Sequence, residues 1–553
     1  MKLPRPLWML ALFGCLYLLA VPVDTMDVDA SQYASMSREM MESGSYLQVY
    51  EQGRDYLDKP PFLFWINSLS MLLFGANNFA FKFPSILFAL LALFATYRLA
   101  RLYYDEQLAR LALLVLGSTQ ALFLITNDIK TDTILMGWVA LALWQLATWM
   151  ETKKKTPFYI GCTAIAFGMM TKGPIALLVP VFALGSHLLL TRRWKLLLQP
   201  VLPAGLLLIA VLLLPMSYGL YQQFDLHPEK TVNGMQGVSG LRFFYWTQSF
   251  GRITGESVWN NGASFTFLFE NLLWAWLPWT LFLITGLLTS VGQLLKNRLR
   301  LPAGEESIST GGFVITYCSL AVSKFQLPHY IYVVLPLAAI ITAKPLYRFL
   351  QGNLPHRLSS VLHAVQWLVV VLLLVFPYFL LTIVFPQQAG VAAWMVPVAT
   401  ALAVLRIAFR SKSKAKLLYA SMAAIIGANI LLSTWFYPNL LYFQASNNAG
   451  RFIQQQNVPQ GKFVMFQYKG NSYSVHFYSR QIVPRINAID SLPPNAWLLT
   501  GKEGKQSLDR AGYRYEVVKS GPDFHISTLT PAFLNAQTRA SVLDTFYILK
   551  LQQ

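Results

Sequence analysis

Apolar segments of the length needed to cross a membrane recur along most of the chain. A helical span takes about 20 apolar residues, and thirteen segments of the 553-residue sequence approach or reach that length. Only 12% of the residues are charged, about half the fraction found in soluble domains. We therefore expect a mainly α-helical, polytopic membrane protein with about 13 transmembrane helices. The expected spans are 6–23, 80–100, 108–126, 132–150, 157–171, 174–190, 200–220, 264–294, 312–324, 329–344, 361–384, 390–408 and 417–437.

The positive charges fall in every second loop. With Lys2 and Arg5 in the cytoplasm, the other basic clusters all lie on the cytoplasmic side, as the positive-inside rule requires. This distribution explains the net charge of +19 without nucleic-acid binding. The odd number of spans then places the C-terminus outside the cytoplasmic membrane. The N-terminal segment has the basic start and apolar core of a signal peptide, but no small-residue cleavage site follows, which favours a retained span. The other clusters lie at 98–110, 153–155, 192–195, 296–300, 344–357 and 406–416.

The regions on the outer side include two long loops, 24–78 and 221–263. Within the first loop, 31–43 has an apolar face at helical spacing, and 61–74 is apolar but too short to span. We expect both segments to be helices that lie in the membrane interface.

The last part of the chain has a different composition. Strand patterns occur within Gly461–Ser479, at 496–501 and at 513–518, and a helical pattern occurs at 447–457. We expect a transmembrane domain over 1–437 and a small extracytoplasmic α/β domain over 438–553. Disulfides and cysteine-rich metal sites are not expected, because the three cysteines lie within or beside apolar segments. They are Cys15, Cys162 and Cys318.

Several acids stand at the predicted outer surface of the membrane. Asp29 follows the first span, Asp132 opens the fourth, and Asp58 begins the sequence Asp-Lys-Pro-Pro ahead of the predicted interfacial helix. Each acid has an ordinary interpretation, as a solvated loop residue or as a partner of a helix dipole. Each also has a functional one, because an ionisable group at membrane depth marks a functional site by default. Asp29 would serve as general base or metal ligand.

Cations at the same surface break the expected charge pattern. Lys172 and Lys324 stand in short outer turns, where lysine is not favoured, and Lys59 follows Asp58. Either these side chains snorkel to the interface, or they point into a cavity and hold a phosphate. Arg252, in the second outer loop, either clamps a phosphate or pairs with an acid. His476, on a predicted strand, is either structural or a metal ligand.

One chemistry uses both kinds of charge at one membrane surface. A lipid-linked sugar phosphate keeps its phosphate at the headgroup level and its chain in the bilayer. Cations can hold the phosphate and stabilise the leaving anion, while a carboxylate deprotonates the acceptor as it attacks the sugar. No nucleotide is needed, which agrees with the absence of a glycine-rich phosphate loop from the sequence.

Five ordered motifs resemble the GT-C membrane glycosyltransferases of the protein O-mannosyltransferase type, above all their bacterial aminoarabinose lipid A transferase branch. The resemblance covers 1–345 well and the later spans only in hydropathy. The motifs are VDASQYASMSREMMESG at 28–44, YLDKPPFLFWINSLSMLLFG at 56–75, TDTILMGWVALALW at 131–144, MMTKGPIALLVP at 169–180 and SKFQLPHYIYVVLPLAAII at 323–341.

The resemblance implies a GT-C fold and an inverting enzyme that transfers a hexosyl or pentosyl group from a polyprenyl-phosphate donor such as undecaprenyl phosphate. It implies that Asp29 is the catalytic acid, and that Asp58 and Lys59 belong to the donor or metal site. The acceptor would be a lipid, glycan or protein. Where the family commonly has Pro-Asp-Glu, this chain has Val28-Asp29-Ala30, and Asp58 replaces a glutamate. One divalent metal therefore remains an open expectation.

Two other classes of protein compete with this interpretation. A transporter or lipid flippase would also need many spans and intramembrane charges, but it usually has repeated halves and a site at mid-membrane depth, and the sequence shows no repeat. A receptor or assembly subunit would leave the outer lysines unexplained. We expect a monomeric enzyme.

Overall fold

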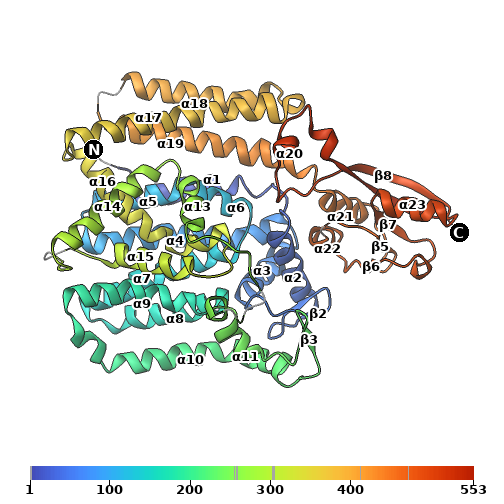
Figure 1. Cartoon of the computed structure of the whole chain (residues 1–553), viewed down its shortest axis with the longest axis horizontal. Coiled ribbons are helices and arrows are strands. Elements are labelled where there is room, and N and C mark those ends of the chain that lie inside the picture. The colour runs from blue at the N-terminus through green and yellow to red at the C-terminus, as the bar shows by residue number, and fades with distance from the viewer. Residues whose placement is uncertain are drawn as a thin grey trace.

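The chain forms a bundle of long helices with a smaller, sheet-containing unit at one end (Figure 1). The computed structural model describes residues 3–254, 256, 259–301, 305–410, 413–470 and 472–552. The bundle helices are α1 (Pro6–Leu18), α4 (Asn78–Tyr103), α5 (Glu106–Gly117), α6 (Gln120–Asn127), α7 (Thr131–Thr152), α8 (Lys155–Lys172), α9 (Ile175–Thr191), α10 (Val201–Leu220), α13 (Phe267–Ala275), α14 (Thr280–Lys296), α15 (Ile308–Ala321), α16 (Leu335–Gln351), α17 (His356–Phe379), α18 (Val391–Arg410) and α19 (Ala415–Leu431).

Each of the thirteen expected spans corresponds to one of these helices or to a broken pair of them. Among the described residues, seven helices are long and apolar enough to cross a membrane, or eight if the bent pair α5 and α6 counts as one span. Others, such as α1, α9, α14 and α15, are apolar but shorter. A mainly α-helical, multi-pass membrane protein is confirmed, while the number of crossings stays a prediction.

The outermost helices show their apolar side chains to the surroundings. On α18, Val391 and Phe409 are 85% and 84% exposed, which is costly in water and natural in lipid. The central helices α4 and α7 instead pack closely against each other. A side chain at Gly137 of α7 would place its Cβ 2.8 Å from the carbonyl oxygen of Phe88. Glycine at this position therefore lets α7, which carries Asp132, lie against α4.

The first outer loop folds into two helices, α2 (Asp29–Ser43) and α3 (Phe62–Phe74). Both expected helices are therefore confirmed as helices. However, α2 is not a surface helix, because it is covered by α3 on one side and by α22 (Tyr473–Ser479), from the last part of the chain, on another. Its Met36, Ser37 and Arg38 are almost fully buried. Short hairpins β1–β2 (Tyr50–Glu51, Arg54–Asp55) and β3–β4 (Thr231–Val232, Met235–Gln236) complete the outer loops with α11 (Gly240–Arg242) and α12 (Gly251–Thr254).

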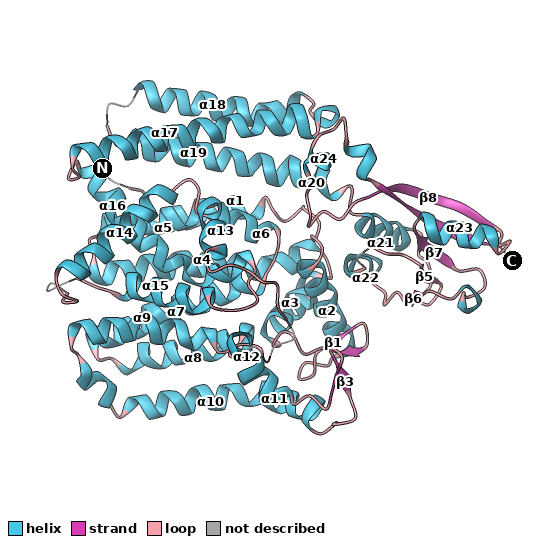
Figure 2. Ribbon diagram, in the orientation of Figure 1, coloured by secondary structure: helices cyan, strands magenta, loops and turns pink. Residues whose placement is uncertain are grey.

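The C-terminal unit is built on a five-stranded sheet in the order β6-β5-β7-β9-β8 (Figure 2). The first three strands of this order are parallel, and β9 runs antiparallel to both of its neighbours. Helices cover both faces: α21 (Ala445–Gln455) and α22 pack on Phe463 and Met465, and α23 (Lys502–Arg510) packs on Val464 and Phe466. The strands are β5 (Phe463–Phe466), β6 (Arg485–Ile486), β7 (Trp497–Thr500), β8 (Tyr515–Asp523) and β9 (Asp544–Leu551).

One expectation for this unit is wrong. The expected helix at 447–457 and the strands at 496–501 and 513–518 are confirmed, but only the first half of Gly461–Ser479 is a strand. Its second half is α22, so His476 lies on a helix. Val475 and Phe477 favour a strand by propensity, but such propensity depends on context. Here both side chains are buried, Val475 among the α21 and sheet residues and Phe477 in the main core cluster of the bundle.

Candidate active site

The amino ends of α2 and α7 carry the two acids of the site. Asp29 is the first residue of α2, and Asp132 is the second residue of α7. A carboxylate in the first helical turn is favoured by the backbone N–H groups and the helix dipole. The local sequence therefore places each acid in the first turn of its helix. The packing of the two helices then brings both acids into one region.

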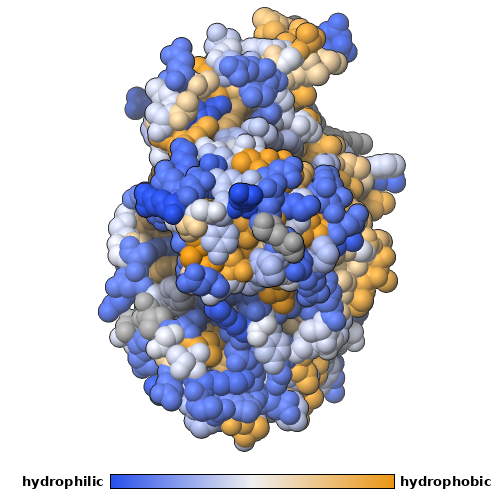
Figure 3. Space-filling view, turned by 90° about the vertical axis from the view of Figure 1, so that its right-hand side faces the viewer, coloured by the Kyte–Doolittle hydropathy of each residue, from blue (hydrophilic) through white to orange (hydrophobic). Residues whose placement is uncertain are grey.

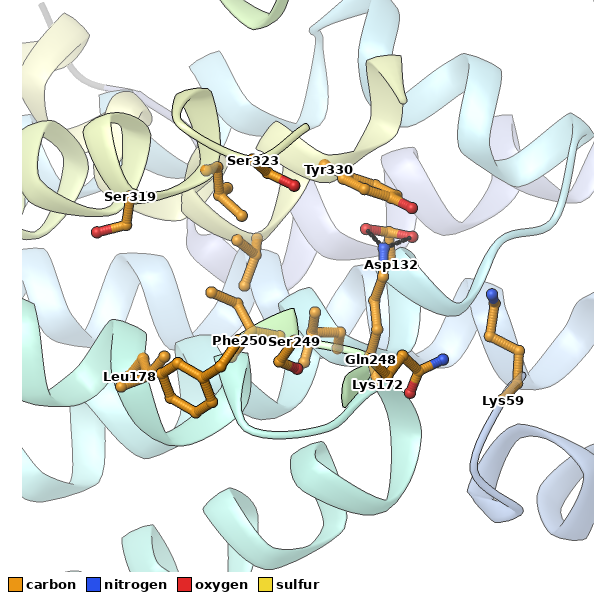
Figure 4. Close-up of a pocket in the computed structure, with 14 residues that line it drawn as sticks. Lys59, Asp132, Lys172, Leu178, Gln248, Ser249, Phe250, Ser319, Ser323 and Tyr330 are labelled. Atoms are coloured by element: carbon orange, nitrogen blue, oxygen red, sulfur yellow. Dashed lines mark hydrogen bonds and ion pairs between the residues drawn. The ribbon is translucent and has the colours of Figure 1, made fainter. Parts of the chain in front are cut away.

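A small cavity of about 120 Å³ lies beside Asp132 (Figure 4). Its polar wall includes Lys59, from the segment before α3, and Lys172, at the end of α8. Lys172 donates to both carboxylate oxygens of Asp132, at 2.6 and 2.7 Å, and its Nζ lies 4.1 Å from the centre of the Tyr330 ring. The Asp132 side chain is only 1% exposed. The cavity thus contains a buried ion pair and a second lysine at its edge.

A much larger cavity, of about 1100 Å³, lies near this ion pair, since it is lined by His329, whose Nε2 is 3.7 Å from Asp132. Its polar end holds Asp29, Asp128 and Lys130, and Lys130 Nζ lies 3.1 Å from Asp29 and 3.2 Å from Asp128. Most of the remaining wall is apolar and comes from α17, α19 and the helical turns after α19, with side chains such as Leu372 and Phe436. The cavity is therefore amphipathic, with charged groups gathered at one end.

The electrostatic environment keeps Asp29 ionised. Burial alone would raise the pKa of its carboxyl, but the positive charges of Lys130, Lys59 and Lys172 outweigh burial and lower it. Two of these lysines, Lys59 and Lys172, line the small cavity, so Asp29 is coupled to both cavities. His329 also joins them: it lines the large cavity and its Nε2 lies 3.7 Å from Asp132.

The structure brings some of the predicted site residues together and places others elsewhere. Asp29, Lys59, Asp132 and Lys172 form the site just described. Asp58 instead accepts a hydrogen bond from Asn233 at 2.9 Å, and its side chain does not line either cavity. The side chain of Lys324 is exposed, outside both cavity walls. Arg252 lies in α12, and its side chain falls outside the described residues.

The expected metal ligands are not assembled. Within the described part of the chain, no three His, Cys, Asp or Glu side chains are placed to hold a metal ion. Asp29 pairs with Lys130 and Asp58 with Asn233. His476 is buried in the C-terminal unit, where its Nδ1 accepts from the Val483 N–H at 2.9 Å. Among the described residues, this set of side chains therefore does not fit a divalent metal.

Sequence reasoning missed Lys130, His329 and Tyr330. Lys130 stands in the same short outer turn as Asp128, where a lysine is as unexpected as at Lys172, so the same signal could have found it. The other two lie in the motif SKFQLPHYIYVVLP, beside a proline that starts a helical segment. Nothing in their local pattern indicates that they face Asp132 and Lys172.

Comparison with known proteins links part of the sequence to lipid-dependent glycosyltransferases. Residues 58–218 match the family described as dolichyl-phosphate-mannose-protein mannosyltransferase. An undecaprenyl phosphate-alpha-4-amino-4-deoxy-L-arabinose arabinosyl transferase of Proteus mirabilis is 29% identical over 323 residues, which are 57% of this chain and 54% of that protein. One from Sodalis glossinidius is 34% identical over 172 residues, 30% of this chain and 31% of that protein. The sequence matches thus span about half the length of these relatives or less.

Solved structures extend the likeness to the whole chain. The crystal structure of ArnT from Cupriavidus metallidurans bound to undecaprenyl phosphate matches with a TM-score of 0.73, covering 98% of this chain and 97% of that one at 16% identity. The fold is that of ArnT. The apo form of the same ArnT matches with a TM-score of 0.72 and 17% identity. The sequence matches and this shared fold together confirm the resemblance to the aminoarabinose transferases, and the shared fold confirms the fold class. The coverage includes the C-terminal unit, so the likeness to ArnT is not restricted to the helical bundle.

Proposed function

We propose that this protein is a glycosyltransferase that moves a sugar from a polyprenyl-phosphate donor to a lipid acceptor at the outer face of the cytoplasmic membrane. The observation that carries the proposal is a pair of cavities that share one set of charges: Lys59, Asp132 and Lys172 line the small cavity, and Asp29 lines the large one and has its pKa lowered by those two lysines. The shared fold with an ArnT that binds undecaprenyl phosphate supports a donor of that kind. The named activity of the sequence relatives supports a pentosyl sugar, and the apolar wall of the large cavity supports a lipid acceptor.

The small cavity suits the donor phosphate. Lys59 and Lys172 supply positive charge, and Ser249 and Tyr330 add hydroxyl groups to the wall. Lysine ammonium groups stabilise a phosphate by charge and by hydrogen bonds, most strongly where water is excluded. Asp132 accepts two hydrogen bonds from Lys172 and so positions this cation. It takes no direct part in the chemical step.

The large cavity suits the acceptor. Its apolar wall can accept acyl chains, and its charged end places a headgroup beside Asp29. In the transfer step, an acceptor hydroxyl loses its proton to the Asp29 carboxylate while its oxygen bonds to the anomeric carbon. The bond between that carbon and the phosphate oxygen breaks, and the polyprenyl phosphate leaves with the bonding electrons. Attack from the side opposite the phosphate inverts the anomeric centre.

The membrane orientation follows from the same proposal. The end of the molecule that carries the C-terminal unit is mainly hydrophilic, as Figure 3 shows for the face seen from the right of Figure 1. A surface of this kind belongs outside the hydrocarbon layer. With Lys2 and Arg5 in the cytoplasm, this end lies on the outer side, and a monomer holds the complete site.

Donor turnover tests the proposal directly. Purified wild-type protein is supplied with a panel of undecaprenyl-phosphate sugars and crude envelope lipids, and released undecaprenyl phosphate is followed by mass spectrometry. We expect release by the wild type, and a loss of at least about a hundredfold in Asp29→Asn, the range that general-base catalysis contributes. Asp490→Asn, at an exposed position of the C-terminal unit, is the matched control. Release at equal rates by Asp29→Asn would exclude Asp29 as the base, and no release with any donor would favour a flippase.

A further inference from the structure

A third cavity, of about 400 Å³, lies in the C-terminal unit, at one edge of its sheet. It is lined by the segments that follow three strands: Gln467–Gly470 after β5, Gly501–Glu503 after β7, and Asp523–Ile526 at the end of β8. The start of β9, at Asp544, completes this wall. Because β5, β7 and β8 all run in one direction and β9 runs against them, these segments meet at the carboxyl edge of the sheet.

The topology explains why a crevice exists at this edge. From β5 the chain leads into α22, which covers the face of Phe463 and Met465, and from β7 it leads into α23, which covers the face of Val464 and Phe466. Two neighbouring parallel strands whose connections leave towards opposite faces define a topological switch point. In open α/β sheets, ligands bind in the crevice outside the strand ends at this point. The position of the cavity is therefore that of a ligand site.

This crevice, defined by the three segments and Asp544, adjoins the large cavity of the bundle. Asp27 and Ile526 line both. Asp27 belongs to the first outer loop, accepts hydrogen bonds from Ser31 and Ser446, and stands two residues before Asp29. Two residues of backbone span at most about 7 Å. The crevice therefore lies next to the backbone segment that carries the candidate base.

The wall of the crevice favours ligands that donate hydrogen bonds. Four carboxylates line it, at Asp27, Glu503, Asp523 and Asp544, against two lysines, at Lys469 and Lys502. Glu503 is paired with Lys469 at 2.6 Å, and Asp523 accepts from the Tyr468 hydroxyl at 2.8 Å. Ionised carboxylates only accept hydrogen bonds. Hydroxyl and ammonium groups are the ligand groups that match such a wall.

We propose that this crevice binds the sugar headgroup of the lipid acceptor, while the acyl chains of the same molecule occupy the large apolar cavity. The inference rests on the proposed glycosyl transfer, and it adds a second binding element to it. The C-terminal unit holds the hydroxyl- and amino-bearing ring, and the outer loop that carries Asp27 and Asp29 lies between that ring and the donor. Acceptor choice is thereby assigned to the C-terminal unit and donor choice to the bundle.

Binding of a soluble headgroup tests the inference independently of turnover. Full-length protein in nanodiscs is titrated with a glucosamine disaccharide and with its N-acetylated form, and binding is followed by saturation-transfer NMR. The wild type should bind the amino form more tightly. The double variant Asp523→Asn/Asp544→Asn should bind it at least about tenfold more weakly, since hydrogen bonds to charged groups are of that size. Asp509→Asn replaces a carboxylate on α23 that pairs with Lys505, outside the crevice, and should bind as the wild type does.

The outcomes separate this inference from the proposed function. If the double variant folds poorly, Asp544→Asn alone, at an exposed position, should still weaken binding measurably. In the transfer assay, the variants should raise the KM for the acceptor and leave its kcat and the donor KM unchanged. Three results would overturn the inference. They are transfer by a wild type that does not bind the disaccharide, equal binding of the disaccharide by the wild type and the double variant, and displacement of the sugar by inorganic phosphate. Sugar binding without any transfer would refute the enzyme and retain the site.

Discussion

The ion pair between Asp132 and Lys172 offers a quantitative test of how the site is built. Both Asp132 oxygens lie within 2.7 Å of Lys172 Nζ, and the two side chains are 1% and 16% exposed. At 2.7 Å the attraction between unit charges is about 6 kcal/mol for an effective dielectric constant of about 20. Desolvation of both charges offsets most of this, so the pair as a whole adds little net stability, whereas removal of one partner leaves a buried charge and costs about 3–5 kcal/mol.

Three variants distinguish these contributions. Lys172→Met removes the lysine that pairs with the buried Asp132, and Asp132→Leu removes the carboxylate that pairs with Lys172. Each single substitution should therefore lower the free energy of unfolding by about 3–5 kcal/mol. The double variant should recover to within about 2 kcal/mol of the wild type, because the methionine can still contact the Tyr330 ring. It should nevertheless be inactive in donor turnover, since a phosphate-binding cation is gone. Unfolding is measured by denaturant titration in mixed micelles, with the same preparations used for turnover.

The reasoning is refuted by either of two results. A double variant as unstable as the sum of the two single variants would show that the pair is not energetically coupled. A double variant that is stable and active would show that Lys172 has a structural role only, and that the donor phosphate is held by other groups of the small cavity.

Two further predictions concern single groups. Lys59→Gln should raise the donor KM about ten- to a hundredfold, the range of a charge-assisted hydrogen bond. Lys324→Gln should leave the donor KM unchanged, because Lys324 is exposed and lies outside the cavity wall. Equal effects of the two substitutions would contradict the assignment of Lys59 to the donor site. For Asp27, burial raises the pKa from 3.8 to about 6. The Asp27 carboxyl therefore keeps its proton to a higher pH in the folded protein than in the unfolded chain. As a result, the free energy of unfolding falls by about 3 kcal/mol as the pH rises from about 4 to 6. Asp27→Asn should therefore gain stability relative to the wild type between pH 4 and 7 in thermal unfolding curves, and a constant difference would refute the burial argument.

The helical bundle was predictable because lipid leaves a chain few choices. Backbone groups without water must pair within helices, so a run such as Val391–Arg410 is a helix whatever surrounds it, and that is what the structure has. Water imposes no such limit on the C-terminal unit. There the helix α22 was mistaken for a strand, because packing against α2 and α21 rather than local propensity decides its conformation.

The site was predictable in its residues and less so in its pairings. Asp29, Asp132 and Lys172 stand out in the sequence as charges at membrane depth, and the structure brings them together. Their partners depend on contacts between distant segments: Lys130 with Asp29 across about 100 residues, and Lys172 with Asp132 across 40. The sequence shows which charged residues are present, but only the fold shows which of them form ion pairs.

This pairing bears on how the site can hold an anionic donor. Lys130 is shared by Asp29 and Asp128, and Lys172 is held by Asp132, so both of these lysines already face carboxylates. A donor phosphate that enters the small cavity must compete with Asp132 for Lys172. The phosphate can compete with Asp132 only if it makes hydrogen bonds that Asp132 does not make. Lys59 and Tyr330 line the same cavity and can donate such hydrogen bonds to the phosphate. The two hydrogen bonds to Asp132 therefore orient the lysine before the donor arrives.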